Sequence, residues 1–196
     1  VNSILLWTDI SQFNIIDYGY ADLDMFFFVS PILLLLFIPS ISMRSFSEEY
    51  KSGTIELLIT KPINILEIIL AKFFAIMTVI FISLIPTIFY VISIYYLGET
   101  IGNLDLAAVL GSYIGLILLS ILFTSISIFC SSLSKNQIIS FVYSIVICCI
   151  FHYGFDILSN IYFLNDIDLF IQRIGISYHY DNISKGLITF SNVIYF

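Results

Sequence analysis

Charged residues divide the chain into four long apolar stretches, at positions 25–43, 73–97, 106–130 and 138–155, and none of these contains Asp, Glu, Lys or Arg. An α-helix needs about 20 residues to cross a hydrocarbon layer of about 30 Å. One Lys or Asp at the centre of a span costs about 2.5–3.5 kcal/mol, whereas each Leu or Ile contributes only about 0.3–0.6 kcal/mol. The absence of charge over these lengths therefore predicts four transmembrane helices.

The apolar runs do not alternate with polar residues as the strands of a membrane barrel do, so the predicted fold is an all-α, polytopic membrane helix bundle. Pro39 and Pro86 fall inside two of the spans and predict kinks. The two ends are also apolar, and we interpret 1–7 as the end of an earlier span and 191–196 as the start of a later one. Residues 1–196 are thus expected to form one transmembrane domain, with four complete spans of a six-span parent.

The composition supports a membrane protein and excludes several other classes. Hydrophobic residues make up 60% of the chain and charged residues only 11%, too few to solvate a globular surface. The net charge is −7 and no basic patch exists to neutralise phosphates, so no nucleic-acid partner is expected. The three cysteines lie inside apolar runs, which argues against a disulfide framework or a metal site.

The distribution of positive charge predicts the orientation in the membrane. Segment 44–72 carries four of the seven Lys and Arg residues, and the turn 131–137 carries Lys135. Because cationic loops stay in the cytoplasm, both segments are predicted to be cytoplasmic, and 8–24, 98–105 and 156–190 to be external. The lipid bilayer is the expected partner along every span.

Segment 44–72 is long for a loop between spans and has a helical pattern. Phe46, Tyr50 and Leu57 are expected to share one helical face. Gly53 suits the left-handed position that ends a first helix, and Thr54 can then cap a second short helix that ends before Pro62.

The next span has an entry signal of its own, because Asn64 and Glu67 are spaced as a capping box for the helix that continues into the membrane. The segment as a whole has two interpretations: an amphipathic linker resting on lipid headgroups, or a short helix docking in a groove of another protein.

The segment also resembles a known signature. It is similar to the cytoplasmic run of ABC-2-type exporter permeases, on the stretch from Arg44 to Ile63. The wider chain resembles the gliding-motility-associated branch of that family at four further stretches: 18–24, 111–116, 134–138 and 175–180.

This resemblance implies a six-helix permease whose cytoplasmic segment couples it to a separate ATP-binding cassette subunit. It also implies a second permease or auxiliary membrane subunit, in a homodimer or heterodimer. The coupling role carries over to the positions that match the signature: Glu48, Glu49, Gly53, Thr54, Glu56, Leu57, Leu58 and Pro62. No G-x-x-x-x-G-K-[ST] run is present to bind phosphates, so this chain is not expected to be an enzyme or to hold a cofactor, and ATP and Mg²⁺ would be bound by the partner.

A stripe of small residues runs along the third span. Small residues at this spacing let helices approach closely, so the stripe predicts packing within the subunit or, alternatively, a dimer seam. Its members are Gly111, Gly115, Ser120, Thr124 and Ser127.

The two histidines lie near the predicted outer face. His152 is expected to be a structural residue near the outer interface, because no predicted span holds a carboxylate for a proton relay. His179 stands too far from other ligand types for a metal cluster. In the external tail, Ile167, Phe170, Ile171 and Ile174 form an apolar stripe, and Gly175 is expected at the left-handed end of that helix.

The sequence therefore favours a permease subunit of an ATP-driven ABC-2-type transporter, associated with gliding motility. The alternative is a membrane-embedded structural or assembly subunit of a motility or secretion machine that moves no substrate itself. An ion-coupled secondary transporter is the least favoured, since the spans lack intramembrane carboxylates.

Overall fold

The computed structural model describes residues 23–97, 104–159, 172–187 and 189–196, and within them the chain forms helices and no strand. Four of the helical stretches are long and apolar enough to cross a membrane: Asp24–Ser52, Ile65–Tyr96, Leu106–Leu133 and Gln137–Ser159. The prediction of an all-α polytopic bundle is confirmed. The predicted end of an earlier span at 1–7 and the stripe at 167–171 lie outside the described residues.

The long helices begin and end as follows: α3 at Asp24–Ser42, α6 at Ile65–Leu84, α7 at Ile88–Leu97, α8 at Leu106–Leu133 and α9 at Gln137–Cys149. The helix of the second predicted span thus begins eight residues before position 73, because Asn64 and Glu67 form the expected capping box and start the helix outside the apolar stretch. Asn136 and Asp105 cap α9 and α8 in a similar way, each accepting backbone N–H bonds.

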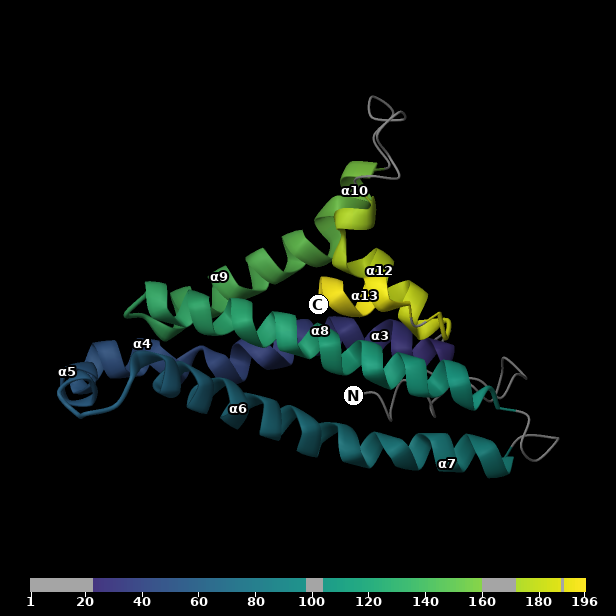
Figure 1. The fold of residues 1–196 in the computed structure, drawn as a ribbon, viewed down its shortest axis with the longest axis horizontal. Helices are drawn as coiled ribbons and strands as arrows, with labels where there is room; N and C mark the ends of the chain where they lie inside the picture. The colour runs from purple at the N-terminus through teal and green to yellow at the C-terminus, as the bar shows by residue number, and fades with distance from the viewer. Residues whose placement is uncertain (1–22, 98–103, 160–171, 188) are drawn as a thin grey trace.

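Helix α8 lies at the centre of the bundle (Figure 1). It packs against α3, α9 and α6, and its N-terminal half also packs against the short helix at Ile176–Ser184. Its buried side chains include Leu116, Leu119 and Phe123, none of which is exposed. The paired helices α6 and α7 are more peripheral, since only 17% of their apolar stretch is buried against the rest of the chain, compared with 44% for α8.

Two of the four spans change helix type along their length, and a third contains two prolines. Pro86 lies in a 3-10 turn, Ile85–Thr87, that separates α6 from α7, as the missing proline N–H predicts. Helix α9 passes into a π-helical turn, η2 (Ile150–Gly154), and then into the short helix α10 (Phe155–Ser159). Pro31 and Pro39 both lie inside α3.

Two short helices follow on the predicted outer side, α12 (Ile176–Ser184) and α13 (Phe190–Tyr195). Helix α12 packs against η2 and against the N-terminal half of α8 (Figure 1). The expectation for Gly175 is wrong: its φ is −74°, and it precedes α12 in an extended conformation instead of ending a helix in the left-handed region. A side chain here would meet Phe155 Cβ at 3.1 Å, so close approach accounts for glycine better than backbone conformation does.

Candidate functional site

The candidate site is the segment between α3 and α6, which forms two short helices, α4 (Arg44–Ser52) and α5 (Thr54–Ile59). Only Met43 separates α4 from α3, and it keeps helical backbone angles. Gly53 turns the chain between α4 and α5 with φ of 72°, the left-handed conformation that glycine adopts without a Cβ penalty. The prediction for Gly53 is confirmed.

Two local predictions in this segment are wrong. Thr54 does not cap α5, because the turn at Gly53 is so tight that Gly53 itself occupies the cap position and Thr54 is already helical. Leu57 does not share a face with Phe46 and Tyr50: it is 67% exposed, whereas Phe46 is buried. A periodicity counted across Gly53 fails because the left-handed residue changes the direction of the helix axis.

Lys72 ties this segment to the membrane helix α6. Its Nζ lies 2.5 Å from Glu49 Oε1 and 4.1 Å above the centre of the Phe46 ring. It also donates a hydrogen bond to the carbonyl oxygen of Ser45. The side chains of Lys72 and Glu49 are only 18% and 28% exposed, so water screens this ion pair less than an ordinary surface pair. The other carboxylate oxygen of Glu49 is buried and has no hydrogen-bond partner among the described residues.

Ser131, near the C-terminal end of α8, holds the junction of α3 and α4. Its Oγ accepts hydrogen bonds from the backbone N–H of Phe46, at 3.0 Å, and of Ser47, at 3.3 Å. The same hydroxyl donates to the carbonyl oxygen of Met43 at 3.1 Å. A side chain that enters a backbone ladder in this way creates a defined bend in the chain path. Helix α4 is therefore bound by two other helices: by α8 through the hydroxyl of Ser131 and by α6 through the ammonium group of Lys72.

The eight positions of the predicted coupling set differ in exposure. Glu49 and Leu58 are half-buried, with Glu49 held by Lys72. The remaining six are exposed on the outer surface of the segment: Glu48, Gly53, Thr54, Glu56, Leu57 and Pro62. The surface of α5 and its flanks thus combines an exposed leucine with carboxylates, which suits contact with another protein.

The small-residue stripe lies inside the subunit. Ser120, Thr124 and Ser127 are not exposed at all. A Cβ at Gly111 would stand 2.6 Å from the carbonyl oxygen of Ile183, and a Cβ at Gly115 would stand 3.3 Å from the Tyr180 ring. Both glycines therefore let α12 lie directly against the backbone of α8.

Sequence reasoning missed the polar contacts that hold α12. Tyr180 Oη donates to the carbonyl oxygen of Phe27 at 2.8 Å, and Ser112 Oγ donates to that of Ser184 at 3.0 Å. Ser177 Oγ donates to Asp156 Oδ2, one helical turn beyond His152. No sequence signal marks these pairs, because their partners are 21 to 153 positions apart.

Both histidines are structural in this arrangement. His152 is 3% exposed and packs edge-on against Phe123, so its side chain is part of the packing within the subunit. His179 Nδ1 lies 2.9 Å from Asn192 Oδ1 and Nε2 lies 2.8 Å from the Arg173 carbonyl oxygen, which fixes α12 against α13. Within the described ranges, no group of three or more His, Cys, Asp or Glu residues could hold a metal ion.

Comparison with known proteins gives one match. A family model described as "ABC-2 family transporter protein" matches residues 5–187. No curated protein and no solved structure matches the chain. The matched range includes the four candidate spans, the segment of α4 and α5, and all of α12.

Proposed function

The chain belongs to the ABC-2 transporter family and is a multi-pass membrane permease subunit that is not itself the ATPase; from this premise we propose that ATP hydrolysis in a separate ATP-binding cassette subunit changes the conformation of the permease by displacing α5 and α4. The observation that carries the proposal is the double attachment of α4, to α6 by Lys72 and to α8 by Ser131. A partner that pushes on the exposed side of α5 would displace two membrane helices together.

The surface of the segment supports a protein partner over a lipid surface alone. Glu48 and Glu56 are exposed, and carboxylates are repelled by an anionic leaflet. Leu57, which follows Glu56 on α5, is 67% exposed and offers an apolar anchor for a groove. We place the coupling contact on this side of α5, with ATP and Mg²⁺ held by the partner.

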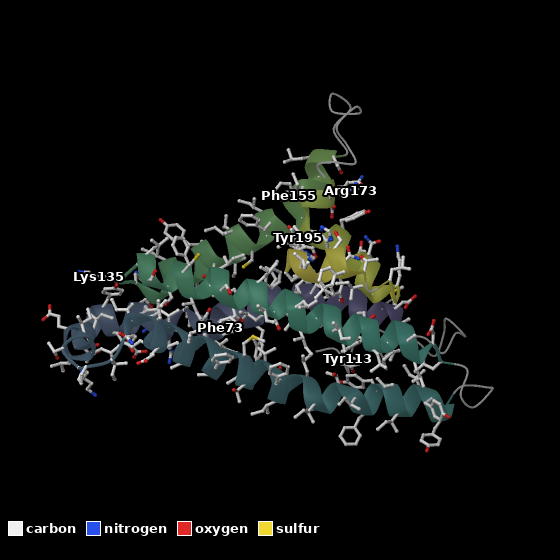
Figure 2. The ribbon with its side chains drawn as sticks, in the orientation of Figure 1. Phe73, Tyr113, Lys135, Phe155, Arg173 and Tyr195 are labelled. Carbon is white, nitrogen blue, oxygen red and sulfur yellow. The ribbon has the colours of Figure 1, made fainter. Side chains whose placement is uncertain are left out.

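The proposed orientation puts α4, α5 and the turn at 131–137 in the cytoplasm. Lys135 lies at the same end of the bundle as α4 and α5, so the two cationic segments meet one side of the membrane (Figure 2). This supports the positive-inside assignment, with α7, α12 and the start of α8 toward the outside. We propose the bacterial inner membrane as the location, with a second permease or auxiliary membrane subunit completing the pathway.

Association with gliding motility is the finer part of the proposal. It is supported by the branch-like stretches at 111–116, 134–138 and 175–180. In such a machine the subunit could also serve assembly without transport, and ATP-dependent flux in proteoliposomes separates the two roles.

The coupling role is tested by capture of the ATPase from the native host with a tagged permease. Leu57→Asp is expected to abolish copurification and stimulation of the ATPase, because it places a charge in the proposed apolar contact. Leu133→Asp is the matched control: Leu133 is 59% exposed and is the last residue of α8, so it carries the same substitution outside α5. Unchanged capture and stimulation with Leu57→Asp, or equal loss with both variants, would overturn the proposal.

A further inference from the structure

An apolar groove of about 380 Å³ lies beneath α5. Three elements besides α5 form its walls: α4, the N-terminal part of α6 and the C-terminal part of α8. The side chains that matter for its chemistry are Phe46, Ile55, Leu58, Ile68, Ile128 and Ser132. Leu58 thus points into the groove, whereas its neighbour Leu57 is 67% exposed.

The walls offer almost nothing to a polar occupant. Among the described residues that line the groove none is charged, and two of the three hydroxyl groups there already donate hydrogen bonds. Ser125 Oγ donates to the Ile121 carbonyl oxygen at 2.9 Å, and Ser132 Oγ donates to that of Phe129 at 2.7 Å. Water in such a space needs two to four polar partners, so a chain of waters is poorly held. The lining therefore selects hydrocarbon.

The position of the groove identifies the source of that hydrocarbon. It opens where two candidate membrane spans reach the cytoplasmic end of the bundle, since α6 begins at Ile65 and α8 ends at Leu133. Phe129, on its wall, is 60% exposed on the flank of α8. The groove is thus continuous with the surface that these spans present to the bilayer, and acyl chains of one leaflet meet it directly.

We propose that the groove binds one acyl chain of a phospholipid from the cytoplasmic leaflet, which fills the space between α5 and the spans. The chain would lie against Leu58 and Ile55 on one side and Ile128 on the other. Tyr50, also on the wall and 37% exposed, carries the third hydroxyl and can donate to the ester region of the same lipid. The bound chain acts as a spacer that fixes the distance of α5 from the membrane helices. Lipid binding itself requires no ATPase, and only this spacer effect on coupling rests on the proposed function.

The test uses the purified full chain in nanodiscs of phosphatidylcholine, with a small fraction of phosphatidylcholine that carries a diazirine at the end of one acyl chain. After irradiation, labelled residues are located by peptide mass spectrometry. Labelling is expected at Ile55 and Leu58 well above that at Leu57 of the same short helix. Equal labelling of the three residues, or the absence of lipid adducts at Ile55 and Leu58, would overturn the proposal.

A variant pair checks that the label reports the groove. Ser132→Phe fills it and is expected to lower labelling of Leu58 to the level of Leu57. Ser93→Phe is the control, because Ser93 is also half-buried and donates to a carbonyl of its own helix, at 2.7 Å, but lies on α7. Ser93→Phe should leave the labelling of Leu58 intact. Equal loss with both variants, or no loss with Ser132→Phe, contradicts the assignment, and the wild-type comparison of Leu58 with Leu57 stands whether or not a variant folds.

Discussion

Replacement of Lys72 by Met is expected to release α4 from α6. Methionine keeps an apolar stem over the Phe46 ring but removes the ammonium group. That group pairs with Glu49 Oε1 at 2.5 Å, lies 4.1 Å above the Phe46 ring and donates to the Ser45 carbonyl. The variant leaves the Glu49 carboxylate, one oxygen of which is fully buried, without its counter-charge. Removal of one partner of a buried ion pair is strongly destabilising, because the remaining charge stays buried and unpaired.

The size of the effect follows from these contacts. A hydrogen bond to a charged group contributes about 1.5–3 kcal/mol, and a cation–π contact at a partly exposed site about 0.5–1 kcal/mol. Partial exposure of both side chains reduces the ion-pair part. We expect Lys72→Met to lower the free energy of local opening of α4 by about 2 kcal/mol, which corresponds to roughly thirtyfold faster amide exchange in α4.

The assay is hydrogen–deuterium exchange of α4 peptides from the protein in nanodiscs, with Lys51→Met as the control. Lys51 is an exposed lysine on α4 itself, and no ion pair of Lys51 occurs among the described residues. A Glu49→Gln/Lys72→Met double variant should be less damaged than the sum of the single variants, with a coupling energy of about 1 kcal/mol or more. Additive single effects, or equal exchange in Lys72→Met and Lys51→Met, would refute the role of this pair.

Three further variants test other parts of the structure. Ser131→Ala removes the acceptor of two α4 amides and should destabilise the junction of α3 and α4 by about 1–3 kcal/mol in thermal unfolding, whereas Ser132→Ala, whose hydroxyl bonds only within its own helix, should have little effect. Gly111→Ala places a Cβ 2.6 Å from a backbone oxygen of α12 and should expose α12 to proteolysis, while Gly154→Ala meets only a side chain at 3.5 Å and should be tolerated. Burial raises the pKa of the Asp181 carboxyl above its ordinary value of 3.8. The folded state therefore holds this proton more tightly than the unfolded state, so the group's stabilising contribution is complete below pH 3.8 and is lost as the pH rises through the raised pKa. Asp181→Asn should remove this part of the pH dependence of the melting temperature.

Features that depend on residues close in sequence could be predicted. Absence of charge over a long stretch is sufficient for a membrane helix, and the four spans follow from it. The capping box of Asn64 and Glu67 and the left-handed turn at Gly53 each need only a few neighbouring residues, and both are present. The same local reasoning failed at Thr54, because Gly53 serves as the end of one helix and the cap of the next.

Contacts between distant positions could not be predicted, because packing decides them. Lys72 and Glu49 are 23 positions apart, and their pairing depends on the angle at which α4 returns toward α6. A lysine at the start of a span has the same sequence context whether it meets lipid headgroups or a carboxylate. The contact of Tyr180 with Phe27 could not be predicted either, since it joins α12 to the first described span, 153 positions earlier.

The properties of α8 explain how a motion of α4 could reach the opposite face of the membrane. α8 has 28 residues without proline, which at 1.5 Å each is a rod of about 42 Å. Its C-terminal end holds α4 through Ser131, and its N-terminal half receives α12 at Gly111 and Gly115. α6 also holds α4, but Pro86 interrupts its path and provides a place where bending can be absorbed. If α4 displaced both α8 and α6, the movement would therefore be transmitted to the opposite end of the bundle mainly by α8, because the two ends of a continuous helix move together.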